Sequence, residues 1–335
     1  MAEFSPSADR LATVFGGSGF VGRHIVRALA RDGWRIRVAV RRPDLAGFLR
    51  PLGVVGQIEL VQANLRYPDS VAAALEGADA VVNASGIKRQ SGRQTYEAAH
   101  VIGAGEIARA AAAAGIDRLV HVSGVGADPR ALNPYIASKG RGETAVREAS
   151  PTAVILRPTV IFGPEDDFLN RFGALARVLP ALPLFGGGET RLQPVFVGDV
   201  GSAALAVIGD AGAAGRTYEL GGPEVLTLRE IATLTLRIVE RRRALVPLPF
   251  GLAHLVAWST EVASTLSLGR FPKALTTTRD QVELLRHDNV VSAAAIAEGR
   301  TLRELGISPQ GIEAVAPSYL YRFRKTGQYA ARRLA

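Results

Sequence analysis

The chain has 335 residues, 47% of them apolar, and a net charge of +9 at neutral pH. It contains no cysteine, which excludes disulfides and thiolate metal sites and fits a reducing compartment. Its five histidines show no metal-ligand spacing and its first residues lack the regions of a signal peptide, so we expect neither feature. A chain with this positive charge is expected to bind an acidic partner. Because no basic helix carries interleaved aromatic residues, we expect lipid or protein and no nucleic acid.

The first predicted element is an apolar strand over residues 11–15, which enters a glycine-rich turn and continues as an amphipathic helix over residues 22–32. Three glycines follow the G-x-x-G-x-x-G spacing of a dinucleotide-binding unit. One makes the tight turn, one lets backbone N–H groups approach a pyrophosphate, and one lets the helix pack on the strand. The sequence therefore predicts a cofactor turn whose binding residues are Gly16, Ser18, Gly19, Phe20 and Gly22.

The second predicted strand, residues 35–40, ends in a basic pair, Arg41 and Arg42. A Rossmann domain that binds NAD usually has an acidic residue there, which holds the ribose 2′-hydroxyl. Two guanidinium groups suit a 2′-phosphate instead, so we predict that the cofactor is NADPH. The alternative is a glycine-rich turn followed by a solvated arginine pair.

Strand and helix candidates continue to alternate as far as residue 156. This alternation predicts an α/β fold, a Rossmann-type doubly wound parallel sheet, followed by a smaller, mostly helical C-terminal domain. Residues that end the strands are expected to face the cofactor, with Asn64 near the adenine and residues 83–86 and 122–124, among them Ser85 and Gly86, toward the nicotinamide. The further candidates are strands over 58–62, 80–83, 119–123 and 153–156 and helices over 70–76, 95–114 and 139–149.

After Leu156 the alternation is interrupted by prolines and glycines. Residues 194–200 are expected to form a further strand that ends in Asp199. The domain boundaries that we expect are 1–165 for an NADP(H)-binding domain, with 190–222 returning to it, and 166–189 with 223–335 for a C-terminal domain that ends in a basic and aromatic docking tail.

The candidate catalytic set is Ser123, Tyr135 and Lys139. Tyr135 and Lys139 form a Y-x-x-x-K motif, which on a helix places the phenol and the ammonium on one face. The ammonium is expected to lower the pKa of the tyrosine, so that the phenol can act as an acid or base near neutral pH. The serine hydroxyl, at the end of a neighbouring strand, could hold a substrate carbonyl. The alternative is a helix with an exposed tyrosine and lysine.

The glycine triplet, Ser123 and the Y-x-x-x-K motif resemble the short-chain dehydrogenase/reductase superfamily, in its extended or atypical branch, over residues 10–230. More narrowly, several stretches resemble the dinucleotide-binding accessory subunits of respiratory complex I, the alpha subcomplex subunit 9 family. General reductases need none of these stretches, and the likeness runs almost to the C-terminus. The stretches are residues 50–53, 161–172, 193–200, 278–283, 305–309 and 318–322.

This resemblance implies that the chain holds NADPH as a structural cofactor beside other complex I subunits. It also implies a position where the hydrophilic arm meets the membrane near the quinone site, without direct quinone chemistry. The implied location is peripheral, on the cytoplasmic face of the inner membrane, or on the matrix side if the protein is eukaryotic. Tyr135 and Lys139 would hold the nicotinamide ribose whether or not a hydride moves. The implied nucleotide contacts are the glycine triplet, Arg41, Asn64, Tyr135, Lys139 and Pro158.

Two segments of the second half have a composition suited to a membrane surface or a partner. Residues 244–258 follow three arginines, carry no formal charge apart from His254, and are too short and too broken by proline to span a bilayer. They either lie in a membrane interface or pack inside the C-terminal domain. The tail from Ser318 carries five basic residues, four aromatic residues and no acid, which favours docking on a partner or on lipid headgroups.

Three functions remain open. The chain is a non-catalytic NADPH-holding subunit of complex I, an NADPH-dependent reductase or epimerase for a small carbonyl or sugar substrate, or a regulator that changes partner with NADPH. Only eleven residues separate Ser123 from Tyr135, a tighter loop than in sugar-nucleotide epimerases, and a soluble enzyme has no obvious use for the tail. Both features favour the first function, whereas the intact Ser-Tyr-Lys set leaves the second open.

Overall fold

The structure is a computed structural model that describes residues 10–266, 279–325 and 327. The chain divides into two compact units, so that it returns to the first unit twice. Residues 197–220, the first segment that returns to the first unit, lie within the range 190–222 that is expected to do so. Residues 291–308 also belong to the first unit, although they are expected in the C-terminal domain. The first unit comprises Met1–Pro158, Val197–Leu220 and Val291–Ser308, and the second comprises Thr159–Phe196, Gly221–Val290 and Pro309–Ala335.

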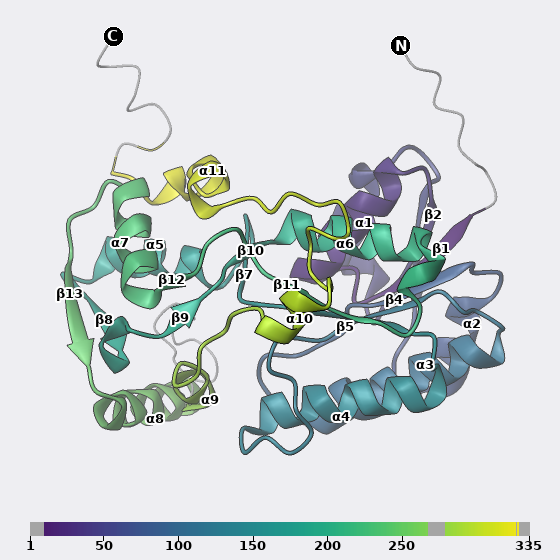
Figure 1. The fold of residues 1–335 in the computed structure, drawn as a ribbon, viewed down its shortest axis with the longest axis horizontal. Helices are drawn as coiled ribbons and strands as arrows, with labels where there is room; N and C mark the ends of the chain where they lie inside the picture. Colours follow the sequence, from purple (N-terminus) through teal and green to yellow (C-terminus); the bar gives the residue numbers. More distant parts are fainter. Residues whose placement is uncertain (1–9, 267–278, 326, 328–335) are drawn as a thin grey trace, which may run out of the picture. The chain divides into compact units, whose positions relative to one another are not determined.

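Seven parallel strands form the central sheet of the first unit. Their spatial order is β11 (Thr217–Leu220), β6 (Val154–Pro158), β5 (Leu119–Val122), β4 (Ala80–Asn83), β1 (Leu11–Phe15), β2 (Arg35–Val40) and β3 (Ile58–Gln62). One face is covered by α1 (Phe20–Arg31) and α6 (Val197–Gly209), and the other by α2 (Pro68–Leu75), α3 (Gly103–Ala113) and α4 (Pro134–Ala149) (Figure 1). This doubly wound sheet confirms the predicted fold class.

The central strands form because apolar side chains occupy both of their faces. All five residues of β1 are buried, and Val14 pairs with Val38 of β2 and with Val82 of β4. Continuous burial is typical of parallel strands that helices cover on both sides. β1 and β4 are neighbours whose following helices lie on opposite faces, so their carboxyl ends form the switch point at which doubly wound sheets bind ligands.

The prediction of a strand over residues 194–200 is wrong from Val197 onward. Only Val195–Phe196 (β10) is extended, and Val197 begins α6 instead. Asp199 therefore lies in the first turn of a helix, where the helix dipole favours a carboxylate. α6 packs closely on α1 because Gly201 has no side chain: a Cβ there would lie 2.8 Å from the carbonyl oxygen of His24.

Short elements complete the first unit and make up the second. In the first unit these are the 3₁₀ helices η1 (Pro43–Leu45), η2 (Gly47–Leu52) and η5 (Ala211–Ala213), the π-helical turn η3 (Glu97–Ile102) and α10 (Ala293–Ala297). The second unit pairs β7 (Ile161–Phe162) with β10, β8 (Ala181–Phe185) with β13 (Ala244–Leu248), and β9 (Arg191–Leu192) with β12 (Leu226–Thr227). Its helices are α5 (Leu169–Val178), α7 (Leu228–Ile238), α8 (Phe250–Leu266), α9 (Arg279–Leu284), α11 (Ile312–Val315) and α12 (Pro317–Leu320), with η4 (Gly186–Gly188) and η7 (Tyr321–Phe323).

Candidate functional site

The glycine-rich turn joins β1 to α1 at the switch point of the sheet. Gly16 has a φ of 74°, and the Gly19 N–H donates to the Gly16 carbonyl at 2.9 Å, which closes the turn. A Cβ on Gly16 would lie 2.8 Å from the backbone after β4, and a Cβ on Gly22 would overlap the Gly16 carbonyl oxygen. Ser18 and Phe20 are half-buried, and α1 begins without a side-chain cap, so its first N–H groups remain available to a phosphate.

Arg23, which no sequence motif indicates, holds this turn from the first turn of α1. Its guanidinium donates to the carbonyls of Ser18 and Gly19 at 3.1 and 3.2 Å and lies over the Phe48 ring, 4.8 Å from the centroid. The contact stabilises the turn and places a positive charge beside the N-terminus of α1. Its position directly after Gly22 is the one sequence feature that could have indicated it.

The two arginines after β2 are exposed and have different partners. Arg42 forms an ion pair with Asp44 at 2.7 Å, which raises the pKa of the guanidinium and lowers the pKa of Asp44. The Arg41 guanidinium instead faces the side-chain amide of Gln94, whose oxygen can accept from it when the amide is turned with its oxygen toward the arginine. This amide is neutral and no ion pair of Arg41 is found among the described residues, so Arg41 is the better candidate for a 2′-phosphate.

Two further candidate nucleotide contacts lie at opposite parts of the sheet edge. Asn64, after β3, is half-buried, and its Oδ1 accepts from the Arg66 N–H at 3.2 Å. Pro158, at the end of β6, is buried, and its carbonyl accepts from the Val125 N–H at 3.0 Å, which fixes the loop after β5. Both residues therefore shape loops at the carboxyl edge of the sheet.

The loop after β4 carries the candidates Ser85 and Gly86. Asn83, expected to face the nicotinamide with them, is buried in the sheet, with its Nδ2 3.1 Å from His121 Nδ1. Its Oδ1 accepts from the Ser85 N–H at 3.0 Å, so it shapes the loop from behind. Gly86 is exposed, and a Cβ there would lie 3.6 Å from both Lys139 Nζ and His100 Nε2.

α4 begins at Pro134, five residues before its expected start, because Asn133 caps it. The Asn133 Oδ1 accepts from the N–H groups of Tyr135 and Ile136, and proline is favoured at the first helical position. Lys139 is buried and its Nζ donates to the Val122 carbonyl at 3.3 Å. The structure thus brings the lysine to the end of β5, directly beside Ser123.

Ser123 has the most informative environment of the candidate set. Its side chain is buried, and its Oγ has no hydrogen-bond partner among the described residues. A buried hydroxyl without a partner is costly, and such groups are found where a ligand or water completes the hydrogen bonds. The environment of Ser123 therefore fits a site that a cofactor or substrate fills.

The acid–base behaviour of the Y-x-x-x-K pair differs from the expectation. Burial raises the pKa of the Tyr135 phenol, so the predicted lowering is wrong for the ligand-free protein. Burial also lowers the pKa of Lys139 to about 8, while the nearby Glu143 carboxylate acts in the opposite direction. Removal from water favours the neutral form of each group, and this outweighs the effect of the ammonium on the phenol.

The charge of Lys139 acts on two buried histidines, and no sequence motif indicates either. The pKa values of His100 and His121 are lowered to about 3, first by burial and then by the charge of Lys139. The His121 Nε2 has no partner in the part of the chain that the structure describes. Both histidines contact residues 38 positions away, so local sequence could not show their role.

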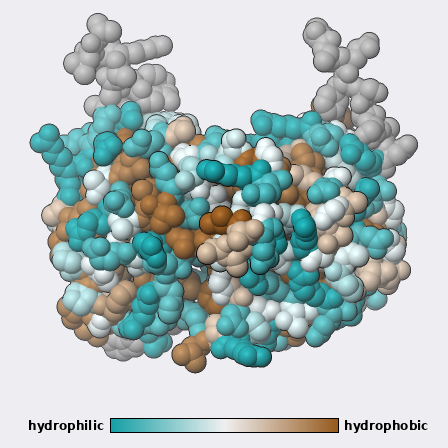
Figure 2. All heavy atoms as spheres, in the orientation of Figure 1, coloured by the Kyte–Doolittle hydropathy of each residue, from teal (hydrophilic) through white to brown (hydrophobic). Residues whose placement is uncertain are grey.

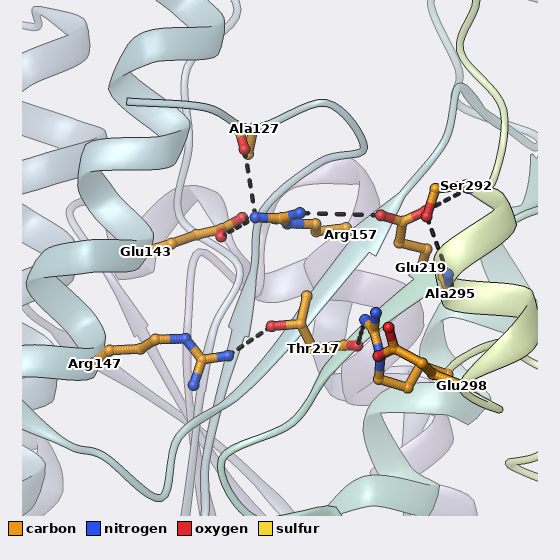
Figure 3. A network of polar contacts seen from close by, with 10 residues as sticks. Ala127, Glu143, Arg147, Arg157, Thr217, Glu219, Ser292, Ala295 and Glu298 are labelled. Carbon is orange, nitrogen blue, oxygen red and sulfur yellow. Dashed lines mark hydrogen bonds and ion pairs between the residues drawn. The ribbon is translucent and has the colours of Figure 1, made fainter. Parts of the chain in front are cut away.

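A network of buried charges holds the second half of α4 in place (Figure 3). Glu143, one turn after Lys139, pairs with Arg157 of β6 at 2.6 Å, and Arg157 lies 3.9 Å from Glu219 of β11. Glu219 in turn accepts from the Ser292 N–H at 2.7 Å. Residues 291–308 therefore belong to the first unit because they complete a charge network that begins on the helix of the Y-x-x-x-K motif.

Two of the sequence stretches that resemble complex I subunits meet in the second unit. Asp166 is buried, and its carboxylate accepts from the backbone before and within α5 and from the Tyr319 hydroxyl at 3.0 Å. Burial raises the pKa of Asp166. Arg322 donates to Asn170 Oδ1 at 2.6 Å. Residues 161–172 and 318–322 therefore form one polar cluster.

The first part of the expected docking tail is instead part of a core. Tyr319 and Phe323 are buried in the second unit, so the docking role expected for these aromatic residues is wrong. Arg324 donates to the Ile238 carbonyl at 2.9 Å, and Arg241 to the Phe323 carbonyl at 2.7 Å. These guanidinium groups bind backbone carbonyls near the ends of helices, which the charge pattern alone does not reveal. Tyr329, Arg332 and Arg333 of the tail lie outside the described residues.

The apolar segment 244–258 contributes to both a sheet and a helix. Residues 244–248 form β13, and α8 buries Ala253 and Ala257 while Leu252 and Leu255 are exposed. Within the described ranges, no helix is long and apolar enough to cross a membrane. On the face drawn in Figure 2, apolar patches are separated by hydrophilic side chains.

Comparison with known proteins identifies the family. The model of the NAD dependent epimerase/dehydratase family matches residues 12–221. This chain belongs to that family. Membership and the doubly wound sheet imply a nicotinamide dinucleotide cofactor. The glycine turn lies at the switch point of the sheet, where doubly wound folds bind their ligands.

Relatives extend the similarity to the second unit. The chain is 32% identical to the mitochondrial NADH dehydrogenase (ubiquinone) 1 alpha subcomplex subunit 9 of Arabidopsis thaliana, over 95% of this chain and 79% of that one. It is 33% identical to ceramide reductase of Caulobacter vibrioides, over 87% and 89%. Triphenylmethane reductase of Citrobacter sp. shares the fold, with a TM-score of 0.72 at 17% identity over 92% and 99%. The predicted resemblance to complex I subunits is confirmed.

Proposed function

We propose that this chain binds NADPH and serves as a non-catalytic accessory subunit of respiratory complex I. The observation that carries the proposal is the similarity to a complex I subunit over 95% of the chain, both units included. In the second unit, the matching stretches build the Asp166 cluster, a structural feature that cofactor binding does not require. A structural role would explain why such a cluster accompanies a Rossmann-type unit.

The proposed choice of NADPH rests on the end of β2. In the part of the chain that the structure describes, no acidic side chain pairs with Arg41, which faces the neutral Gln94 amide, whereas Arg42 pairs with Asp44. In this proposal Arg41 binds the 2′-phosphate, the glycine turn binds the pyrophosphate, and Tyr135 with Lys139 binds the nicotinamide ribose. NADPH would supply a hydride, which a structural role leaves unused.

The cofactor proposal is tested by the nucleotide that the purified protein releases on denaturation. We expect NADPH, and we expect Arg41→Ala to weaken NADPH binding by about ten- to a hundredfold through loss of a charge-assisted contact, with NADH nearly unchanged. Arg42→Ala is the matched control, because Asp44 already pairs with it and a smaller loss is expected. Recovery of NAD(H) alone would contradict the proposal.

The proposed position is peripheral, where the hydrophilic arm of complex I meets the membrane near the quinone site, beside other subunits. It lies on the cytoplasmic face of the inner membrane, or on the matrix side in a eukaryote. Two observations support it: the relative named above is a complex I subunit, and α8 exposes Leu252 and Leu255 while it buries Ala253 and Ala257. Burial of such side chains against a partner would resist washing with salt, which screens charge but not apolar contact.

A second candidate is an NADPH-dependent reductase, which one observation favours. The Ser123 hydroxyl is buried and unpaired beside Lys139, as a group that holds a substrate carbonyl would be, and a ceramide reductase is 33% identical. The test is Tyr135→Phe. The accessory role predicts unchanged NADH oxidation by the membrane, whereas turnover of a carbonyl substrate by the isolated protein, abolished in this variant, would establish the reductase.

A further inference from the structure

His100 links the two segments that border the proposed nicotinamide end of the site. Its Nε2 accepts from the Ile87 N–H at 3.0 Å, in the loop after β4. Its Nδ1 lies 2.9 Å from Ser138 Oγ, on the helix that carries the Y-x-x-x-K motif. The imidazole sits in the π-helical turn η3, and such turns are often found at functional sites.

The hydrogen bonds of His100 all run in one direction. A backbone N–H can only donate, so Nε2 must be unprotonated and Nδ1 carries the proton of the neutral ring. Nδ1–H then donates to the Ser138 hydroxyl, and that hydroxyl donates to the Tyr135 carbonyl at 2.7 Å. A protonated imidazole would place two donors against each other at Ile87. This series of hydrogen bonds, from Ile87 through His100 and Ser138 to Tyr135, can therefore form only when His100 is neutral.

The surroundings of His100 keep it neutral and fix its plane. Its ring stacks on Tyr96 with centroids 5.5 Å apart and meets Tyr135 edge-on at 5.6 Å. Burial and the positive charge of Lys139 hold its pKa near 3. The ring is thus locked between an aromatic side chain and the motif tyrosine.

The link leads directly to the proposed ligand site. The atoms nearest to a Cβ on the exposed Gly86 would be His100 Nε2 and Lys139 Nζ, both at 3.6 Å, and His100 Cδ2 at 3.9 Å. A ligand that approaches the Gly86 backbone therefore lies within reach of the lysine and of the imidazole that holds the loop. A histidine that served packing alone would not need to join these two segments.

We propose that His100 is a positioning residue, which sets the loop after β4 against Tyr135 and Lys139 and so shapes the pocket for the nicotinamide half of NADPH. The inference rests on the proposed NADPH function and deepens it. We expect its largest effect on the nicotinamide half of the ligand, because its two hydrogen-bond partners, Ile87 and Ser138, adjoin Gly86 and Lys139. The two halves can therefore be separated by experiment.

The test compares the affinities of NADPH and of 2′,5′-ADP, which lacks the nicotinamide half, by titration calorimetry on the full chain. We expect His100→Leu to weaken NADPH by about tenfold and 2′,5′-ADP by less than about twofold, since two buried hydrogen bonds are lost at one half of the ligand only. His100→Asn keeps a donor toward Ser138, and His100→Gln keeps an acceptor toward Ile87. Each is expected to recover part of the NADPH affinity.

Thr13→Val is the matched control, because it removes one buried hydrogen bond of the same unit, from Thr13 Oγ1 to the Ala74 carbonyl at 2.8 Å. It should leave both affinities unchanged. Equal weakening of both ligands in the His100 variants would make His100 merely structural and overturn the inference, as would unchanged NADPH affinity. If His100→Leu fails to fold, Ser138→Ala provides the same comparison. Absence of NADPH binding by the unmodified chain would overturn the proposed function itself.

Discussion

The two units treat their buried polar groups in opposite ways. In the first unit, Ser123 Oγ and His121 Nε2 are buried without a hydrogen-bond partner, and they are the only such side-chain atoms in the described residues. In the second unit, the buried Asp166 carboxylate accepts four hydrogen bonds, three from backbone N–H groups and one from Tyr319. At the candidate site of the first unit, buried polar atoms lack hydrogen bonds, whereas the Asp166 carboxylate of the second unit has a full set of them.

This difference separates the roles of two sets of motifs. The glycine turn and the Y-x-x-x-K motif lie in the first unit, and the stretches that meet at Asp166 lie in the second. An unpaired buried polar atom lowers stability by about 1–3 kcal/mol, so its presence near Lys139 fits a site that a ligand completes. The saturated Asp166 instead ties together segments far apart in sequence. We therefore expect substitutions in the first unit to change binding and substitutions in the second to change folding.

The largest effect on binding is expected from Gly22→Ala. A Cβ there would overlap the Gly16 carbonyl oxygen and approach Gly17 Cα at 2.7 Å, so the turn must move away from the place of the phosphates. We expect NADPH affinity to fall about a hundredfold, in line with an overpacking cost of about 3 kcal/mol.

Gly47→Ala is the control for that substitution, because a Cβ at Gly47 meets nothing within 4 Å. Its NADPH affinity should equal that of the unmodified protein. Tight NADPH binding by the Gly22→Ala variant would show that the turn is not the nucleotide site.

Lys139→Met is expected to separate stability from binding within the first unit. The folded-state pKa of Lys139, about 8, lies below its ordinary value of 10.5, so burial of the charge destabilises the protein below pH 8. At pH 7 burial of the charged lysine lowers the free energy of unfolding by about 3 kcal/mol. The methionine variant avoids this cost but loses the hydrogen bond to Val122, so without ligand it should be about 2 kcal/mol more stable.

The pH dependence gives the check on Lys139. As pH rises from 8 toward 10.5, the lysine deprotonates in the folded state first, so the stability advantage of the methionine variant should shrink. Denaturant titrations at pH 7 and pH 10 measure it, and NADPH affinity should fall in the variant. A variant less stable than the unmodified chain at pH 7 would contradict the assigned cost of the buried charge.

Tyr319→Phe tests the second unit. Loss of the hydroxyl removes one of four hydrogen bonds to the buried Asp166 carboxylate, so we expect the free energy of unfolding to fall by about 1–2 kcal/mol. NADPH affinity should not change. Tyr321→Phe serves as the control, because Tyr321 is only half-buried. Loss of NADPH affinity in Tyr319→Phe would remove the distinction between the two units.

The smallest effect is expected from Ser123→Ala. Its hydroxyl is buried and makes no hydrogen bond in the described structure, so its removal should raise the ligand-free stability by about 1 kcal/mol, the lower end of the cost of such a group. Ser138→Ala, whose hydroxyl contacts both His100 and Tyr135, should be clearly more destabilising in thermal unfolding. A large loss of stability in Ser123→Ala would mean that the ligand-free protein already satisfies this hydroxyl.

Local sequence was enough to predict the sheet but not all of its connections. The apolar runs from Leu11 to Leu156 match β1 to β6 because continuous burial of parallel strands leaves an unmistakable pattern. The Val195–Val200 run also contains four apolar residues, yet Val197 begins a helix, which packs on α1 through Gly201. That contact is tertiary and has no local signal.

The residues of the candidate site also fall into two groups: those that local sequence could predict and those that only the fold reveals. The glycine turn and the Y-x-x-x-K motif are local patterns and could be found directly. His100, with its partners Ile87 and Ser138, and the Asp166–Tyr319 contact join residues 13 to 153 positions apart, and the pKa of Tyr135 depends on burial that only the fold creates. Sequence therefore indicates which groups the site uses, and the structure shows what surrounds them.

Native electrophoresis of membranes extracted in a mild detergent after a high-salt wash tests the central claim most directly. We predict that the chain migrates with NADH:ubiquinone oxidoreductase and that denaturation of this band releases NADPH. A variant that ends at residue 325 keeps Tyr319 and Phe323 in the core of the second unit, so it separates loss of the last ten residues from unfolding. Full recovery of the unmodified chain in the soluble fraction at low salt, as a free monomer or dimer, would contradict the accessory-subunit account.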